Sequence, residues 1–117
     1  MYSKVSSKDI NYFKSVIGNN YVFTAESIIK EYSHDETEDL FFLPEVVIKP
    51  EKAKEISEIL IHCNKNQIPV TPCGARTGLS GGSLPIYGGV VLSTERLDKI
   101  IEIDTNNLQA KVEPGVI

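Results

Sequence analysis

The sequence has no tryptophan, one methionine and only two cysteines among its 117 residues. Cys63 and Cys73 cannot form the disulfide framework of a small secreted domain, and they lack the spacing of metal ligands. The sequence also lacks a long apolar run, so it offers neither a signal-peptide core at its start nor a membrane span. We therefore expect a cytoplasmic protein without a metal site.

Positive charge is also scarce. Twelve basic side chains stand against 16 acidic ones, for a net charge of −4, and no basic stripe is interleaved with aromatic residues. This balance argues against a nucleic-acid partner. The acidic segment 34–39 is typical of a solvated loop. With 41% hydrophobic residues, the chain can form one modest globular core.

The most informative segment is a run of small residues at positions 72–83, Pro-Cys-Gly-Ala-Arg-Thr-Gly-Leu-Ser-Gly-Gly-Ser. Glycine reaches positive φ without strain and adds no Cβ, so such a backbone can turn several amide hydrogens toward one point. We expect Gly78 to use positive φ. The run therefore predicts a cradle for an anion such as a phosphate.

Two common phosphate loops do not match this run. Counting a Walker loop from Gly74 places Leu79 at the second glycine, and no lysine follows. Counting a dinucleotide fingerprint from Gly74 places Arg76 at the second glycine. Taken alone, a glycine-rich stretch between strands is more often a plain connection than a ligand site, so its context must decide.

Hydrophobic patterns predict the elements around the loop. Ser6 and Asp9 suggest a capping box for a helix that ends at Gly18, and a second helix is expected from Ala25 to about Glu31. A helix over 51–64, with Pro50 in its first turn, has the clearest periodicity. Its apolar face, which should be buried on a sheet, consists of Ile56, Ile59, Leu60 and Cys63.

Extended segments are predicted at 46–49, 68–71 and 90–93, and a hairpin at 99–103 and 108–112. The first two flank the helix over 51–64, so they form a βαβ unit with parallel strands. The glycine loop leaves the carboxyl end of the second strand, which is where ligands bind in open α/β sheets. The fold class is therefore α+β, with N-terminal helices, a βαβ unit and a small mixed sheet.

Several motifs in order resemble one family. The glycine loop, the upstream segment 44–51 (Pro-Glu-Val-Val-Ile-Lys-Pro-Glu) and the downstream segments 87–93 and 112–116 resemble the start of the flavin-binding domain of the FAD-linked oxidases. The resemblance covers about residues 32–117, and it is greatest to glycolate oxidase large subunits and D-lactate or other D-2-hydroxyacid dehydrogenases. The usual loop of this family has Arg at the position of Cys73 and Gly at the position of Arg76.

The resemblance implies a cofactor site. It predicts that FAD diphosphate is held by loop amides and hydroxyls, and the residues that match the family's loop are Gly74, Ala75, Arg76, Thr77, Gly78, Gly82 and Ser83. Thr77 stands where some related flavoenzymes carry a histidine bonded to the flavin, so the FAD should be noncovalent. Arg76 could add charge to the site or point into solvent. Cys73 could be a reactive thiol or a structural loop residue.

The resemblance also implies an organisation and a function. Residues 1–40 are interpreted as an N-terminal helical segment and 41–117 as the first, incomplete subdomain of an FAD-binding domain. The implied reaction is oxidation of a small 2-hydroxy acid by hydride transfer to flavin N5, with no catalytic residue in this segment. The alternative is a noncatalytic module that keeps the fold. Self-association or pairing with the remainder of the domain is expected in either case.

Overall fold

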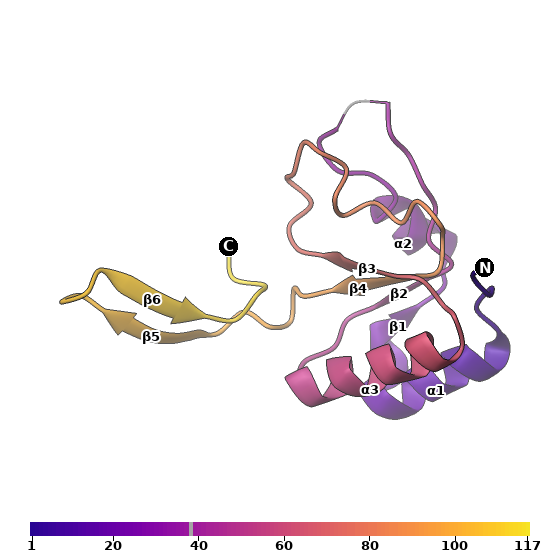
Figure 1. Cartoon of the computed structure of the whole chain (residues 1–117), viewed down its shortest axis with the longest axis horizontal. Coiled ribbons are helices and arrows are strands. Elements are labelled where there is room, and N and C mark those ends of the chain that lie inside the picture. Colours follow the sequence, from indigo (N-terminus) through magenta and orange to yellow (C-terminus); the bar gives the residue numbers. More distant parts are fainter. Residues whose placement is uncertain (38) are drawn as a thin grey trace.

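The computed structural model describes residues 1–37 and 39–117 and has the α+β fold that the sequence predicts (Figure 1). Within these residues it contains three α-helices, a four-stranded mixed sheet and a separate two-stranded hairpin. None of these helices has the length and apolar character needed to cross a membrane.

The N-terminal elements begin with helix α1 (Ser7–Ile17), followed by the short 3-10 helix η1 (Asn19–Tyr21), strand β1 (Val22–Phe23) and helix α2 (Glu26–Glu31). The capping box predicted for α1 is confirmed. Asp9 N donates to Ser6 Oγ at 3.2 Å, and Ser6 N donates to Asp9 Oδ2 at 2.8 Å. These two bonds satisfy backbone donors that would otherwise have no partner at the start of the helix.

The central sheet has the strand order β1-β2-β4-β3. Strands β2 (Val46–Ile48) and β3 (Val70–Cys73) both run parallel to β4 (Val90–Ser93), which lies between them, and β1 is antiparallel to β2. The parallel direction predicted for the βαβ unit is confirmed. Helix α3 (Ala53–Lys65) connects β2 to β3. It begins three residues after Pro50, so the prediction that Pro50 lies in its first turn is wrong.

Each face of the sheet has its own core, because successive side chains of a strand point to opposite faces. On one face the sheet packs on α1 and α3, and on the other it packs on α2 (Figure 1). The α1/α3 core contains Phe13, Ile17, Val22, Val46, Ile48, Ile59, Cys63, Ile68, Val90 and Leu92. The α2 core contains Ile29, Tyr32, Val47, Cys73 and Val91.

The predicted burial of the α3 face holds only in part. Ile59 and Cys63 are 0% and 1% exposed, but Leu60 is 44% exposed, so the prediction for Leu60 is wrong. Helix α1 packs beside α3, and Ile59 and Cys63 of α3 lie in the core that both helices share with the sheet. Leu60 lies at the edge of the apolar stripe of α3, where no described element covers it fully.

The predicted hairpin is confirmed as β5 (Ile100–Asp104) paired antiparallel with β6 (Gln109–Val112). It extends away from the central sheet, to the left in Figure 1. Its large apolar side chains are exposed, namely Ile100, Ile101, Ile103, Leu108 and Val112. This hairpin therefore has no core of its own among the described residues.

Candidate functional site

The glycine loop lies at the carboxyl edge of the central sheet. It leaves β3 at Cys73, and the chain returns to the opposite edge through Gly88 and Gly89 to enter β4. Gly89 has φ +69°, and a Cβ on it would lie 2.3 Å from the Pro69 carbonyl oxygen. Only glycine fits there, because β4 enters the sheet directly against the start of β3.

The loop surrounds a cleft of about 370 Å³. All seven residues proposed from the sequence line it, namely Gly74, Ala75, Arg76, Thr77, Gly78, Gly82 and Ser83. Three further residues that the sequence interpretation did not include also line it, namely Asp35, Leu79 and Ser80. The structure thus brings the proposed residues together around one concave surface.

The cleft is rich in hydrogen-bond donors. Among the described residues, no backbone or side-chain acceptor takes a hydrogen bond from the amides of 75–80, 82 and 83. The hydroxyl-bearing residues Thr77 and Ser80 are exposed at the same surface. A Cβ built on Gly82 would meet no atom within 4 Å, so the space beside this glycine is open. Backbone amides with no protein acceptor are suited to bind an anion.

Positive φ occurs in this loop at Arg76 (φ 60°) and Gly81 (φ 71°). Gly78 is absent from the positive-φ glycines of the described chain, so the expectation for Gly78 is wrong. The turn is made two residues earlier, at Arg76, although a side chain in that conformation costs more than glycine.

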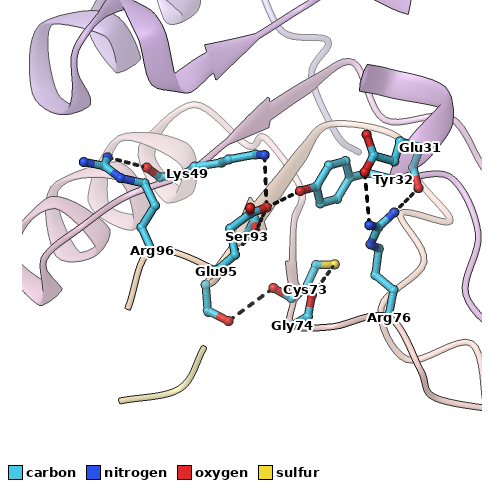
Figure 2. A network of polar contacts seen from close by, with 10 residues as sticks. Glu31, Tyr32, Lys49, Cys73, Gly74, Arg76, Ser93, Glu95 and Arg96 are labelled. Atoms are coloured by element: carbon cyan, nitrogen blue, oxygen red, sulfur yellow. Dashed lines mark hydrogen bonds and ion pairs between the residues drawn. The ribbon is translucent and has the colours of Figure 1, made fainter. Parts of the chain in front are cut away.

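The Arg76 side chain is held by α2 (Figure 2). Its guanidinium lies 4.3 Å from the centroid of the Tyr32 ring. Nη1 donates to the Glu31 carbonyl oxygen, and Nη2 lies 3.3 Å from Glu31 Oε1. The side chain therefore packs on the protein and does not point freely into solvent. Glu31 offsets part of its charge.

A second polar cluster braces the same edge of the sheet (Figure 2). Glu95 Oε1 accepts hydrogen bonds from Lys49 Nζ at 3.0 Å, from Ser93 Oγ at 3.1 Å and from the Tyr32 hydroxyl. Burial raises the pKa of Glu95, but the bonds from Tyr32 and Lys49 outweigh it and lower the pKa overall. The charged carboxylate thus ties the ends of β2 and β4 to α2.

Cys73 is a structural residue of this edge. Its side chain is 2% exposed, and burial is the main reason that the pKa of its thiol is raised above 9.0. Since the thiolate is the reactive form, these surroundings disfavour a nucleophilic role.

The acidic segment near the loop is only partly solvated, which corrects the expectation for 34–39. Asp35 is 7% exposed and packs against the loop, whereas His34 and Asp39 are exposed and Glu38 lies outside the described residues. Asp35 Oδ1 accepts from Thr37 N at 2.8 Å, and Thr37 Oγ1 accepts from Gly81 N at 3.0 Å. A short polar residue two positions before Thr is a local signal for such a turn, but its burial was not visible in the sequence.

A mixed sheet with a donor-rich glycine loop at its carboxyl edge defines a domain suited to bind a phosphorylated cofactor. Residues 44–117 match the family model described as FAD binding domain. The chain therefore belongs to the family of FAD-binding domains of FAD-linked oxidases.

Two relatives agree with this assignment, and a solved structure has the same fold. D-lactate dehydrogenase of Anaerostipes hadrus is 37% identical over 117 residues, which are 99% of this chain and 24% of that protein. Glycolate oxidase subunit GlcD of Bacillus subtilis (strain 168) is 44% identical over 86 residues, which are 74% of this chain and 18% of that protein. A structure of p-cresol methylhydroxylase with substrate bound has a TM-score of 0.83 at 24% identity, covering 99% of this chain and 24% of that one, and it supports the fold. The chain thus spans less than a quarter of the length of the D-lactate dehydrogenase and of the glycolate oxidase subunit.

Proposed function

We propose that this chain forms the diphosphate-binding part of an FAD-dependent oxidoreductase. The observation that carries the proposal is the set of loop amides at 75–80, 82 and 83, which belong to residues that line the cleft and have no acceptor among the described residues. FAD is a dinucleotide with a negatively charged diphosphate, and such a group needs several convergent donors.

The residues present fit this cofactor. The amides, together with the hydroxyls of Thr77, Ser80 and Ser83, would donate to the diphosphate oxygens, and the open space at Gly82 would admit the group without a steric clash. The bonded cluster of Tyr32, Lys49 and Glu95 fixes the ends of β2 and β4, which lie at the same edge of the sheet as the loop. A loop on a rigid edge loses less conformational freedom when it binds.

The proposed reaction is the oxidation of a small 2-hydroxy acid of the glycolate or D-lactate type. Such a substrate loses a hydride from its α-carbon and the proton of its hydroxyl to become a 2-oxo acid, and FAD would supply the hydride acceptor at flavin N5 when it is bound. The names of the two relatives, D-lactate dehydrogenase and glycolate oxidase subunit, support this substrate class. In the proposal, this chain binds and orients the cofactor and provides no catalytic residue.

The FAD is proposed to be noncovalent. Thr77 lines the cleft at the position that the family resemblance assigns to a flavin-bonded histidine in some relatives. A threonine hydroxyl can donate a hydrogen bond but cannot form that linkage to the flavin. Denaturation of the holoprotein in acid or urea should therefore release all of the flavin into solution.

Substitution of Gly82 tests the cradle. Gly82→Val should expel most of the FAD, because a branched side chain fills the open space beside the loop, and Gly82→Ala should have a smaller effect in the same direction. Gly82→Ala should leave the thermal midpoint of the cofactor-free protein nearly unchanged, because a Cβ at this site contacts nothing within 4 Å. Flavin absorbance of the purified full-length variants gives the result. Full retention of flavin in Gly82→Val would overturn the proposed site.

The substrate class needs a separate assay. Holoprotein mixed anaerobically with glycolate, D-lactate or L-lactate should lose its oxidised flavin absorbance with a D-2-hydroxy acid or glycolate. Bleaching by none of these acids would leave the cradle intact and refute the proposed substrate class.

The hairpin β5–β6 provides a proposed docking element for the remainder of such a domain. Its apolar side chains at Ile100, Ile103 and Leu108 are 59%, 66% and 91% exposed. A two-stranded hairpin is marginally stable alone and needs cover for its apolar surface. The matched segments are only 24% and 18% of the two relatives, so these proteins contain enough further chain to supply it.

A further inference from the structure

Among the described residues, one buried side-chain polar atom has no hydrogen-bond partner, and it lies beside the glycine loop. Asp35 is 7% exposed, and its Oδ2 is the buried side-chain oxygen or nitrogen that lacks a hydrogen bond within residues 1–37 and 39–117. Leaving a charged acceptor buried without a donor is costly, so such an atom needs an explanation.

The other carboxylate oxygen shows how Asp35 is held. Oδ1 accepts from Thr37 N at 2.8 Å. The hydroxyl and then the amide of Thr37 are the main causes that lower the pKa of Asp35 below 3.8, so the group is ionised at neutral pH. Thr37 therefore fixes the position of the Asp35 carboxylate.

The glycine loop is attached to the same segment at two further points. Glu36 N donates to the Gly78 carbonyl oxygen at 3.2 Å, and Gly81 N donates to Thr37 Oγ1 at 3.0 Å. Between these two points, Asp35 Oδ2 lies 4.0 Å from the position that a Cβ on Gly78 would take. The free oxygen thus faces the backbone of a stretch whose amides at 78–80 have no acceptor among the described residues.

We propose that Asp35 is a positioning residue for the glycine loop, and that its Oδ2 accepts a hydrogen bond from the loop backbone near Gly78 and holds the loop in its cofactor-binding shape. This inference rests on the proposed function, since the loop is taken to be the diphosphate cradle. Asp35 lines the same cleft as the loop and would take one of its amides, which leaves the others for the ligand. A carboxylate suits this role because it keeps a second acceptor oxygen when Thr37 N occupies the first.

Asp35→Asn separates this role from simple electrostatic repulsion. Asparagine keeps the shape but has only one acceptor oxygen, so one amide hydrogen of its side chain must face a backbone N–H. We expect FAD affinity to fall by about tenfold or more, as for the loss of a hydrogen bond to a charged group. If Asp35 only repelled the diphosphate, the same variant would bind FAD more tightly, and the proposal would be overturned.

Asp104→Asn is the matched control. Asp104 Oδ1 accepts from Asn106 N at 3.1 Å, which is the same type of turn as Asp35 with Thr37, but it lies in the hairpin turn. This variant should leave FAD affinity unchanged. Equal losses in Asp35→Asn and Asp104→Asn would mean that the effect is not specific to the loop, and would refute the proposal.

Amide hydrogen exchange on the cofactor-free full-length protein gives a readout that does not depend on FAD. In Asp35→Asn, exchange at the Glu36, Thr37 and Gly81 amides should become faster by about tenfold, while exchange in β2 and β4 stays unchanged. Unchanged exchange at those three amides would refute the positioning role. Failure of the unsubstituted protein to bind FAD, with the exchange effect present, would refute the proposed function and leave the positioning role standing.

Discussion

At the scale of single residues, Asp9 shows how one carboxylate joins two elements. Its Oδ2 caps α1 through the Ser6 amide, and its Oδ1 lies 2.8 Å from Nε2 of His62 on α3. His62 also stacks on Tyr12 of α1, with ring centroids 4.3 Å apart. The pair therefore ties the two helices that cover one face of the sheet.

The charge on Asp9 makes the fold sensitive to acid. Burial raises the pKa of Asp9, but bonds from Ser6 and His62 outweigh it, so the folded pKa lies below the ordinary 3.8. The stabilisation by ionised Asp9 is thus complete above about pH 3.8 and is lost as pH falls through the folded pKa. Asp9→Asn should cost about 1 kcal/mol at pH 7. Urea denaturation at pH 7 and pH 3 should show that this difference shrinks in acid, and a constant difference would contradict the prediction.

At the scale of elements, α3 offers two neighbouring residues with opposite environments. Ile59 is fully buried against the sheet, whereas Leu60 is 44% exposed. Ile59→Ala should lower the free energy of unfolding by about 2–5 kcal/mol, because it leaves a cavity in the core. Leu60→Ala should cost about 1 kcal/mol or less. Chemical denaturation of both variants measures the difference, and equal losses would mean that the packing of α3 is not as described.

The elements that the sequence predicted well are those with local causes. The Ser6 cap, the periodicity of 51–64 and the alternation of glycine with small residues in the loop all act within a few positions along the chain. They located α1, α3 and the cleft to within a few residues. The hairpin was similarly predicted by its turn at 104–107.

The features that were missed depend on contacts distant in sequence. Asp35 is buried by a loop some 40 positions later, and only the folded chain shows that contact. Leu60 follows Ile59 directly and therefore points about 100° away from it around the helix, and only the folded chain shows that the core reaches Ile59 but not Leu60. The strand order could not be read locally either, because β4 enters between β2 and β3 from further along the chain.

At the scale of the whole molecule, the described residues form only one wall of the proposed cofactor site. The cleft offers donors for a diphosphate, but its lining is a single glycine loop with Asp35. Binding sites for molecules of this size normally bury most of the ligand surface. The relatives carry more than three quarters of their length outside the matched segment, and the exposed apolar hairpin offers a surface on which further chain could pack.

These 117 residues expressed by themselves should therefore purify without flavin colour and bind FAD weakly. Each charge-assisted hydrogen bond contributes about 1.5–3 kcal/mol net, and ordering the loop offsets part of that sum. Most of the apolar surface of FAD would remain in water, so the loop alone would have to supply nearly all the affinity. Titration calorimetry with FAD measures it, with the full-length polypeptide as the positive control. Submicromolar binding by the 117 residues alone would show that they are sufficient to hold FAD. The proposal that further chain completes the cofactor site would then have to be abandoned.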